Sequence, residues 1–218
     1  TPTPTVIVPP PFLGRPFATP TPLPMSVVPG YSLNSLFDHR YPIYSGEPAE
    51  DRDNMYRFDG WQFSGNVHSD NCNTGVDCYG GHDGIDYGTP LGVNIRAAAA
   101  GKVVYRFNPC GWIILEHEQN GSRIYTEYMH MSEIFVDVED EVTAGEVIGE
   151  AGNVADNIHC FSGGDHLHFG VRLYIFPGTS NTNIDPFGWW DPDNPDPWEE
   201  YSDGYTSRWL WRGTSTPP

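Results

Sequence analysis

Residues that break helices constrain the fold class of this chain more than any other feature. The 218 residues include 24 glycines and 21 prolines, which destabilise helix interiors. Between them lie short runs rich in β-branched and aromatic side chains, a pattern typical of strands. The candidate strands are residues 101–107, 112–118, 123–130, 147–149 and 166–176. Asn120-Gly121 separates two of these runs and predicts a hairpin, because both residues tolerate a positive φ. We therefore expect an all-β fold with an antiparallel sheet, either an open sandwich or a barrel-like form.

The charge of the chain limits its partners. Asp and Glu number 29 against 11 Lys and Arg, so the formal net charge is −18. Nucleic acids and anionic lipids reward clusters of basic residues, and this chain would be repelled by both. No apolar run approaches the roughly 18 residues that a membrane span needs. We expect no nucleic-acid partner, no membrane insertion and a monomer, although the sequence leaves the oligomeric state open.

Composition divides the chain into a folded domain with flanking segments. Residues 1–24 contain nine prolines and five threonines, which favour polyproline II and predict a linker or stalk. Residues 214–218 repeat this composition as a Pro/Thr tail, so we expect the domain to occupy residues 25–213. Its last part, residues 191–213, is an acidic extension rich in tryptophan. We expect these tryptophans to pack a core or close a sheet edge rather than bind sugar rings.

The four cysteines are Cys72, Cys78, Cys110 and Cys160. They lack the Cys-x-x-Cys spacing of a zinc site, which favours two disulfides over a metal site or four reduced thiols. Three pairings are possible, and we favour Cys72 with Cys78 and Cys110 with Cys160. The second would close about 50 residues and contribute roughly 4 kcal/mol in the chain-entropy model. With the acidity and the Pro/Thr segments, this indicates an extracellular protein, secreted or associated with the cell envelope.

Several histidines recur at spacings suited to a metal. GGHDGIDYGTP places His82 four residues before Asp86 in a glycine-rich loop, and GGDHLHFGVR places His166 and His168 on one face of a strand. His130 ends the strand before them. Imidazoles and one carboxylate form the ligand set that Zn²⁺ prefers, and a catalytic zinc needs three ligands and one open position. His82, Asp86 and His168 supply three, which leaves His130 and His166 beside the open side.

These motifs, together with AAAAGKVV, YTEYMHMS and VTAGEVIGEAG, follow the order and character of one enzyme family. Over about residues 80–190, including IDPFGWW, the chain resembles the lysostaphin/LytM-type zinc metallopeptidases, metallopeptidase family twenty-three. The resemblance implies one zinc ion per chain, held by His82, Asp86 and His168 in a cleft over an antiparallel sheet. It implies that His130 and His166 are the catalytic pair. It also implies an endopeptidase that cleaves the peptide cross-links of bacterial cell-wall peptidoglycan.

By the same resemblance, metal-activated water attacks the peptide carbonyl. We expect His166 to be the base, with His130 stabilising the oxyanion or donating to the leaving amine, and these two roles can be exchanged. Two positions depart from the family pattern, because Asp165 replaces a common proline and Gly170 a common acidic residue. The alternative function is a module that retains zinc and binds or regulates the cell wall without hydrolysis.

The remaining histidines are expected to lie outside the site. His117 lies in a predicted strand and is expected to be structural, and His39 and His68 precede the motifs and are expected at the surface or in the core. His159 leaves two alternatives, because it either lines the cleft or lies outside it. The segment FDHRYPIYSGEP, residues 37–48, is expected to pack beside the cleft or to cover it.

Overall fold

The computed structural model describes residues 10–17, 32–40, 42, 54–64, 80–156, 158–174, 182–202 and 207–212. Strands dominate these ranges, and their helical elements are two short 3-10 helices, η2 (Asn108–Cys110) and η3 (Pro197–Glu200). The expected all-β fold is therefore confirmed. Within the same ranges, no helix has the length and apolar character needed to cross a bilayer.

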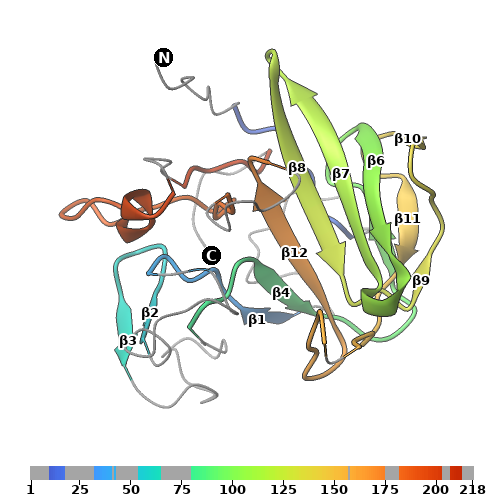
Figure 1. Cartoon of the computed structure of the whole chain (residues 1–218). Helices are drawn as coiled ribbons and strands as arrows, with labels where there is room; N and C mark the ends of the chain where they lie inside the picture. Colours follow the sequence, from blue (N-terminus) through green and yellow to red (C-terminus); the bar gives the residue numbers. More distant parts are fainter. Residues whose placement is uncertain are drawn as a thin grey trace.

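The described residues form three antiparallel sheets (Figure 1). The largest has seven strands in the order β1 (Ser32–Ser35), β4 (Ile85–Gly88), β12 (His166–Arg172), β8 (Ser122–Met129), β7 (Trp112–Gln119), β6 (Gly101–Phe107) and β10 (Glu141–Val142). The second sheet has the order β5 (Asn94–Arg96), β11 (Val147–Glu150) and β9 (Glu133–Ile134). The third is a pair, β2 (Asn54–Tyr56) and β3 (Gln62–Ser64).

The predicted strands match β6, β7, β8, β11 and β12 closely. The hairpin between β7 and β8 turns at Asn120 and Gly121, whose φ angles are 52° and 79°, so the left-handed turn expected from this dipeptide is present. Strand β12 ends at Arg172, four residues before the expected end at residue 176, which lies outside the described residues.

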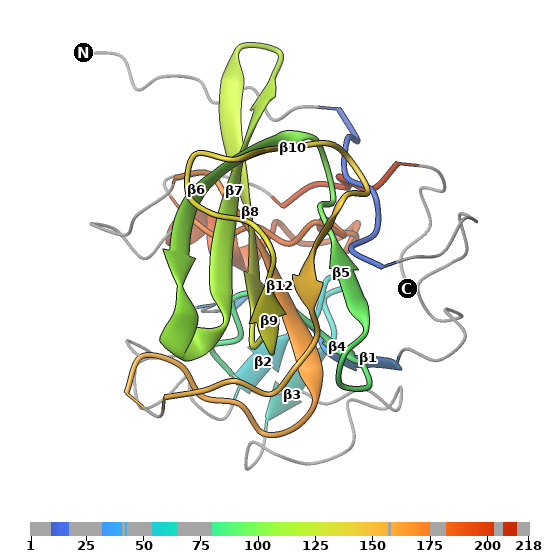
Figure 2. The same cartoon turned by 90° about the vertical axis from the view of Figure 1, so that its right-hand side faces the viewer.

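The central strands of the large sheet have two chemically different faces. Along β12, Leu167, Phe169 and Val171 point to one face and are fully buried in the core. The alternate residues of β12 point to the opposite, polar face. Figure 2 shows the second sheet lying across the large one, and its Ile95 and Ile148 belong to the same buried cluster. The apolar core therefore lies between the two sheets, and the polar face of the large sheet lies on the side away from this core.

Residues 10–17 differ from the linker expected for residues 1–24. Phe12, Leu13 and Phe17 are buried in the main core. The backbone also bonds to the fold, because Leu13 N–H donates to the Leu210 carbonyl at 2.9 Å and Leu13 bridges Trp211 in parallel. A proline-rich composition favours an extended backbone, but apolar side chains on an extended backbone can still be buried in the core. Residues 1–9 and 18–24 lie outside the described residues.

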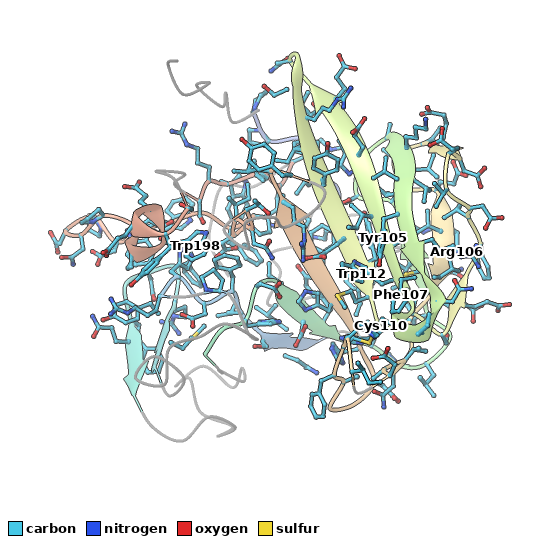
Figure 3. The ribbon with its side chains drawn as sticks, in the orientation of Figure 1. Tyr105, Arg106, Phe107, Cys110, Trp112 and Trp198 are labelled. Atoms are coloured by element: carbon cyan, nitrogen blue, oxygen red, sulfur yellow. A yellow bond between two sulfur atoms is a disulfide. The ribbon has the colours of Figure 1, made fainter. Side chains whose placement is uncertain are left out.

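The C-terminal segment packs against residues that lie between β1 and β2. Trp198 is fully buried beside Phe37, and Figure 3 shows it within the part of the fold formed by the chain's last residues. In the same part of the fold, the buried imidazole of His39 lies between two carboxylates, 3.0 Å from Asp185 Oδ2 and 2.9 Å from Asp196 Oδ1. The expectation that these tryptophans pack a core is confirmed for Trp198, and also for Trp211 in the main core.

One disulfide closes the end of the large sheet where β6 and β7 meet. Cys110 and Cys160 are bonded, so this expected pairing is confirmed, and the bond links η2 to the loop of residues 151–165 (Figure 3). Cys72 and Cys78 lie outside the described residues. The loop held by the disulfide leads directly into β12, which carries two of the candidate site residues.

Candidate active site

The polar face of the large sheet collects all five predicted site residues. His168 on β12 pairs across the sheet with Asp86 on β4 and with Met129, the last residue of β8. His130 follows β8 directly, and His82 lies in the turn before β4. The site therefore lies where β8 ends and β12 begins, and sequence segments up to 86 residues apart meet there.

Three of these side chains converge on one point. His82 Nε2 lies 3.2 Å from Asp86 Oδ1 and 3.2 Å from His168 Nδ1, and the last two atoms are 3.0 Å apart. In a tetrahedral zinc site with bonds of about 2.0–2.2 Å, ligand atoms are separated by about 3.3–3.6 Å. The triangle is thus slightly smaller than a zinc site requires, and a small outward movement of each side chain would fit the ion.

Hydrogen bonds on the side away from the triangle orient the ring of His82, the first candidate ligand. His82 Nδ1 lies 2.7 Å from the Leu36 carbonyl, and because a carbonyl only accepts, Nδ1 carries the proton. When Nε2 of His82 carries no proton, as in a metal-bound ring, its lone pair faces Asp86 and His168. A backbone partner of this kind fixes the tautomer of metal-binding histidines.

The charges of the site favour a bound cation. Burial raises the pKa of Asp86, but the charge of His82 and hydrogen bonds from His168 and His82 outweigh it and hold that pKa well below its usual value. Burial lowers the pKa of His168, but its hydrogen bond to Asp86 and the charge of that carboxylate raise it to about 9. Without a metal, the Asp86 carboxylate therefore favours a proton on His168. A metal ion bound between the two side chains would replace this proton.

The other two histidines face each other beside this triangle. The ring centroids of His130 and His166 are 4.6 Å apart. His130 Nδ1 donates to the Val154 carbonyl at 2.9 Å, and His166 Nδ1 donates to the Gly164 carbonyl at 2.8 Å. In the neutral form of each ring, Nε2 is therefore unprotonated, and Nε2 of His166 lies 3.7 Å from Asp86 Oδ1. Each ring can accept a proton at Nε2 and later return it.

The backbone holds His130 in an unusual conformation. Its φ is 66°, a left-handed value that is uncommon for residues other than glycine and that clusters at functional sites. Burial, followed by the charges of His166 and His168, lowers the pKa of His130 to about 4. The ring is therefore neutral over the physiological range.

The end of β1 and the residues that follow it support the site through contacts that the motifs do not predict. Ser35 Oγ lies 3.2 Å from His82 Nδ1, next to the Leu36 carbonyl. Asp38 accepts a hydrogen bond from Gly81 N–H at 2.8 Å and so fixes the residue before His82. Asp38 of this segment thus contacts the loop that carries His82, as expected for a segment packed beside the site. Most of residues 41–53 lie outside the described residues.

The remaining histidines lie away from this cluster. His117 is buried and bonds to the Ala100 carbonyl at 2.8 Å and to Thr126 Oγ1 at 2.7 Å, so its structural role is confirmed. The side chain of His159 is 59% exposed, pairs with Asp156 at 2.6 Å and lies edge-on to Phe107. His39 is in the core, as described above, and His68 lies outside the described residues.

A family model described as peptidase family M23 matches residues 80–186. The chain belongs to peptidase family M23. The matched M23 region contains all five site residues, and the resemblance seen in the motifs is therefore confirmed.

Individual M23 relatives match over stretches of different length. DD-carboxypeptidase/endopeptidase Mpg of Neisseria meningitidis is 36% identical over 95 residues, which are 42% of this chain and 20% of that protein. Peptidoglycan DD-endopeptidase ShyA of Vibrio cholerae is 27% identical over 64% of this chain and 28% of that protein. The solved catalytic domain of lysostaphin from Staphylococcus simulans is 32% identical over 49% of this chain and 77% of that chain, with a TM-score of 0.42. The chain spans less than a third of the length of these two curated relatives.

Proposed function

We propose that this chain is a zinc-dependent endopeptidase that hydrolyses peptide cross-links of bacterial peptidoglycan. The observation that carries the proposal is the triangle of His82, Asp86 and His168 with two further imidazoles beside it. A structural zinc site would be closed by four ligands and would need no such pair. Relatives in the family are named as peptidoglycan or DD-endopeptidases, which supports this substrate class.

The zinc would be held by His82 Nε2, Asp86 Oδ1 and His168 Nδ1. When bound, zinc supplies a Lewis acid that polarises a peptide carbonyl and lowers the pKa of water toward about 7.

The two remaining imidazoles would move protons. His166 is our proposed base, because its Nδ1 donates to the Gly164 carbonyl and its Nε2 lies 3.7 Å from Asp86 Oδ1, beside the triangle. His130 would stabilise the developing oxyanion or donate to the leaving amine once its Nε2 carries a proton, since its Nδ1 is already bonded to the Val154 carbonyl. Backbone carbonyls hold both rings, so neither role requires a side chain to reorient.

Cellular location and domain limits are part of the same proposal. The Cys110–Cys160 disulfide is typical of oxidising compartments and supports an extracellular or cell-envelope protein. The peptidase domain would run from the segment containing residues 10–17 to about residue 213, because Leu13 and Trp211 pack together. We propose that it acts as a monomer.

Metal content and turnover of dye-labelled peptidoglycan, measured on one preparation, test the function. We expect about one zinc per chain, release of labelled fragments, loss of release on chelation and its return with zinc. Mass spectrometry of the fragments would identify the bond. Asp86→Ala should abolish both zinc binding and release. Zinc binding without release from any peptidoglycan would contradict the hydrolase and favour a zinc-retaining cell-wall module.

A further inference from the structure

A buried row of charges continues the polar face of the sheet beyond the site. Glu127 on β8 is fully buried, and its Oε1 lies 2.8 Å from Arg172 Nε on β12. Arg172 Nη2 lies 3.6 Å from Asp83 Oδ2, and Asp83 Oδ1 lies 3.6 Å from His168 Nε2. The row therefore starts in the interior and ends at a proposed zinc ligand.

Burying these charges is costly, so their presence needs an explanation. Glu127 and Arg172 form an ion pair, and neither Glu127 oxygen has a well-aligned hydrogen bond in the described part of the chain. A buried ion pair of this kind adds little stability compared with apolar side chains of the same volume. Stability alone therefore does not account for it.

The backbone of β12 leaves room for the Glu127 carboxylate. Gly170 pairs directly opposite Glu127 and lies between His168 and Arg172 on the same face. A Cβ at residue 170 would lie 2.3 Å from Glu127 Oε1. The carboxylate can contact Arg172 because residue 170 has no side chain.

The far nitrogen of His168 needs an acceptor. Its Nδ1 faces His82 and Asp86, so when this atom binds a metal the proton must be on Nε2. Nε2 is buried and has no hydrogen-bond partner in the described ranges, and Asp83 Oδ1 lies 3.6 Å from it. A short movement of Asp83 would complete the bond. Such partners fix the orientation of a ligand histidine and raise its basicity.

We infer that Asp83 is a positioning residue for His168, and that Arg172 and Glu127 hold Asp83 in place from two neighbouring strands. The inference rests on the proposed function only in that the site binds zinc. It assigns roles to three charged residues outside the ligand set. It also requires the carboxylate of Glu127, rather than the side-chain volume alone.

Zinc affinity, measured by competition with a chromophoric chelator, tests this inference without using hydrolysis. Asp83→Ala should weaken zinc binding about 10- to 100-fold, the usual effect of removing such a partner. Glu127→Gln keeps the side-chain shape, removes the charge and should cause a smaller loss. Because Glu127 acts through Asp83, the double variant should bind zinc no more weakly than Asp83→Ala alone. Cobalt substitution adds a spectroscopic readout, and the visible bands should shift in Asp83→Ala.

Glu116→Gln is the matched control. Glu116 is also a strand carboxylate beside an arginine, 3.6 Å from Arg123, but that pair does not continue to His168. Its zinc affinity should equal that of the unmodified chain. Zinc affinity and cobalt spectra that are unchanged in both Asp83→Ala and Glu127→Gln would overturn the inference, as would additive losses in the double variant. If the unmodified chain bound no zinc, the inference and the metal part of the proposed function would both fall, whereas zinc binding without hydrolysis would leave the inference standing.

Discussion

His130 and His166 come from different strands, yet their rings lie 4.6 Å apart and each Nδ1 donates to a backbone carbonyl of the loop between residues 151 and 165. Neither ring belongs to the triangle formed by His82, Asp86 and His168. This arrangement supports the proposed division between proton transfer and metal binding. It leads to the first prediction.

His130→Ala and His166→Ala should each keep one zinc per chain and lose activity by about 10²- to 10⁴-fold, the usual contribution of a general acid or base. Metal analysis and release of dye from labelled peptidoglycan measure the two properties on the same sample. His159→Ala is the control, because that exposed ring bonds to Asp156 and should not affect either property. Loss of zinc in both site variants would make these residues ligands and contradict the division of roles.

The motifs predicted which residues meet but not what holds them. The HxxxD and HxH spacings, with strand periodicity, are local patterns, and both describe side chains that the sheet register then brings together. The Leu36 carbonyl that orients His82 is a backbone atom 46 residues away, and no sequence pattern marks a backbone acceptor. The same is true of Val154, whose carbonyl accepts from His130.

Composition predicts a linker over residues 1–24, but part of this segment belongs to the folded core. Proline and threonine predict a local extended backbone, and residues 10–17 contain three buried apolar side chains, Phe12, Leu13 and Phe17. These residues are held by backbone contacts with residues near 95 and 210, which are remote in sequence. A signal was present, since phenylalanine and leucine are unusual in a solvated linker, but composition averaged over 24 residues concealed it.

Gly84 gives a prediction about space near the metal ligands. A Cβ at this position would lie 2.6 Å from His168 Nε2 and 2.8 Å from the Phe169 carbonyl oxygen. Gly84→Ala should therefore push the His168 ring out of the triangle and weaken zinc binding, as measured by chelator competition. Gly163→Ala is the matched control, because a Cβ there would meet no atom within 4 Å. Equal zinc affinities in the two variants would show that the ring has room to adjust.

The disulfide gives a prediction about stability and activity together. The Cys110–Cys160 bond spans 50 residues, and in the chain-entropy model its removal costs about 4 kcal/mol of unfolding free energy. We expect Cys110→Ala/Cys160→Ala to lose stability in urea denaturation of the metal-free protein. Activity should also fall under conditions where the variant is folded, because the released loop carries the carbonyls that hold His130 and His166. Full activity in the folded variant would show that the loop is positioned without the bond.

Buried His39 gives a prediction about pH. Burial lowers its pKa, but the charges of Asp196 and Asp185 and their hydrogen bonds outweigh this and raise it to about 10, above the ordinary value of 6.5. Because the folded state holds the proton more tightly than the unfolded state, the stabilisation is complete below about pH 6.5 and is lost as the pH rises toward 10. The contribution of His39 to the unfolding free energy should therefore fall over this interval with a slope of at most about 1.4 kcal/mol per pH unit.

Urea denaturation of the metal-free chain between pH 6 and pH 10 measures this fall. Asp196→Asn is the informative variant, because it removes one of the two carboxylates that hold the proton, while the bond from His39 Nε2 to Asp185 at 3.0 Å stays. The pKa of His39 should then be lower, and the fall in stability should begin and end at a lower pH. Asp137→Asn, which changes an exposed carboxylate paired with Arg106, should leave the profile of the unmodified chain unchanged. If Asp196→Asn gave the same pH profile as the unmodified chain, the proton on His39 would not be the source of the pH dependence.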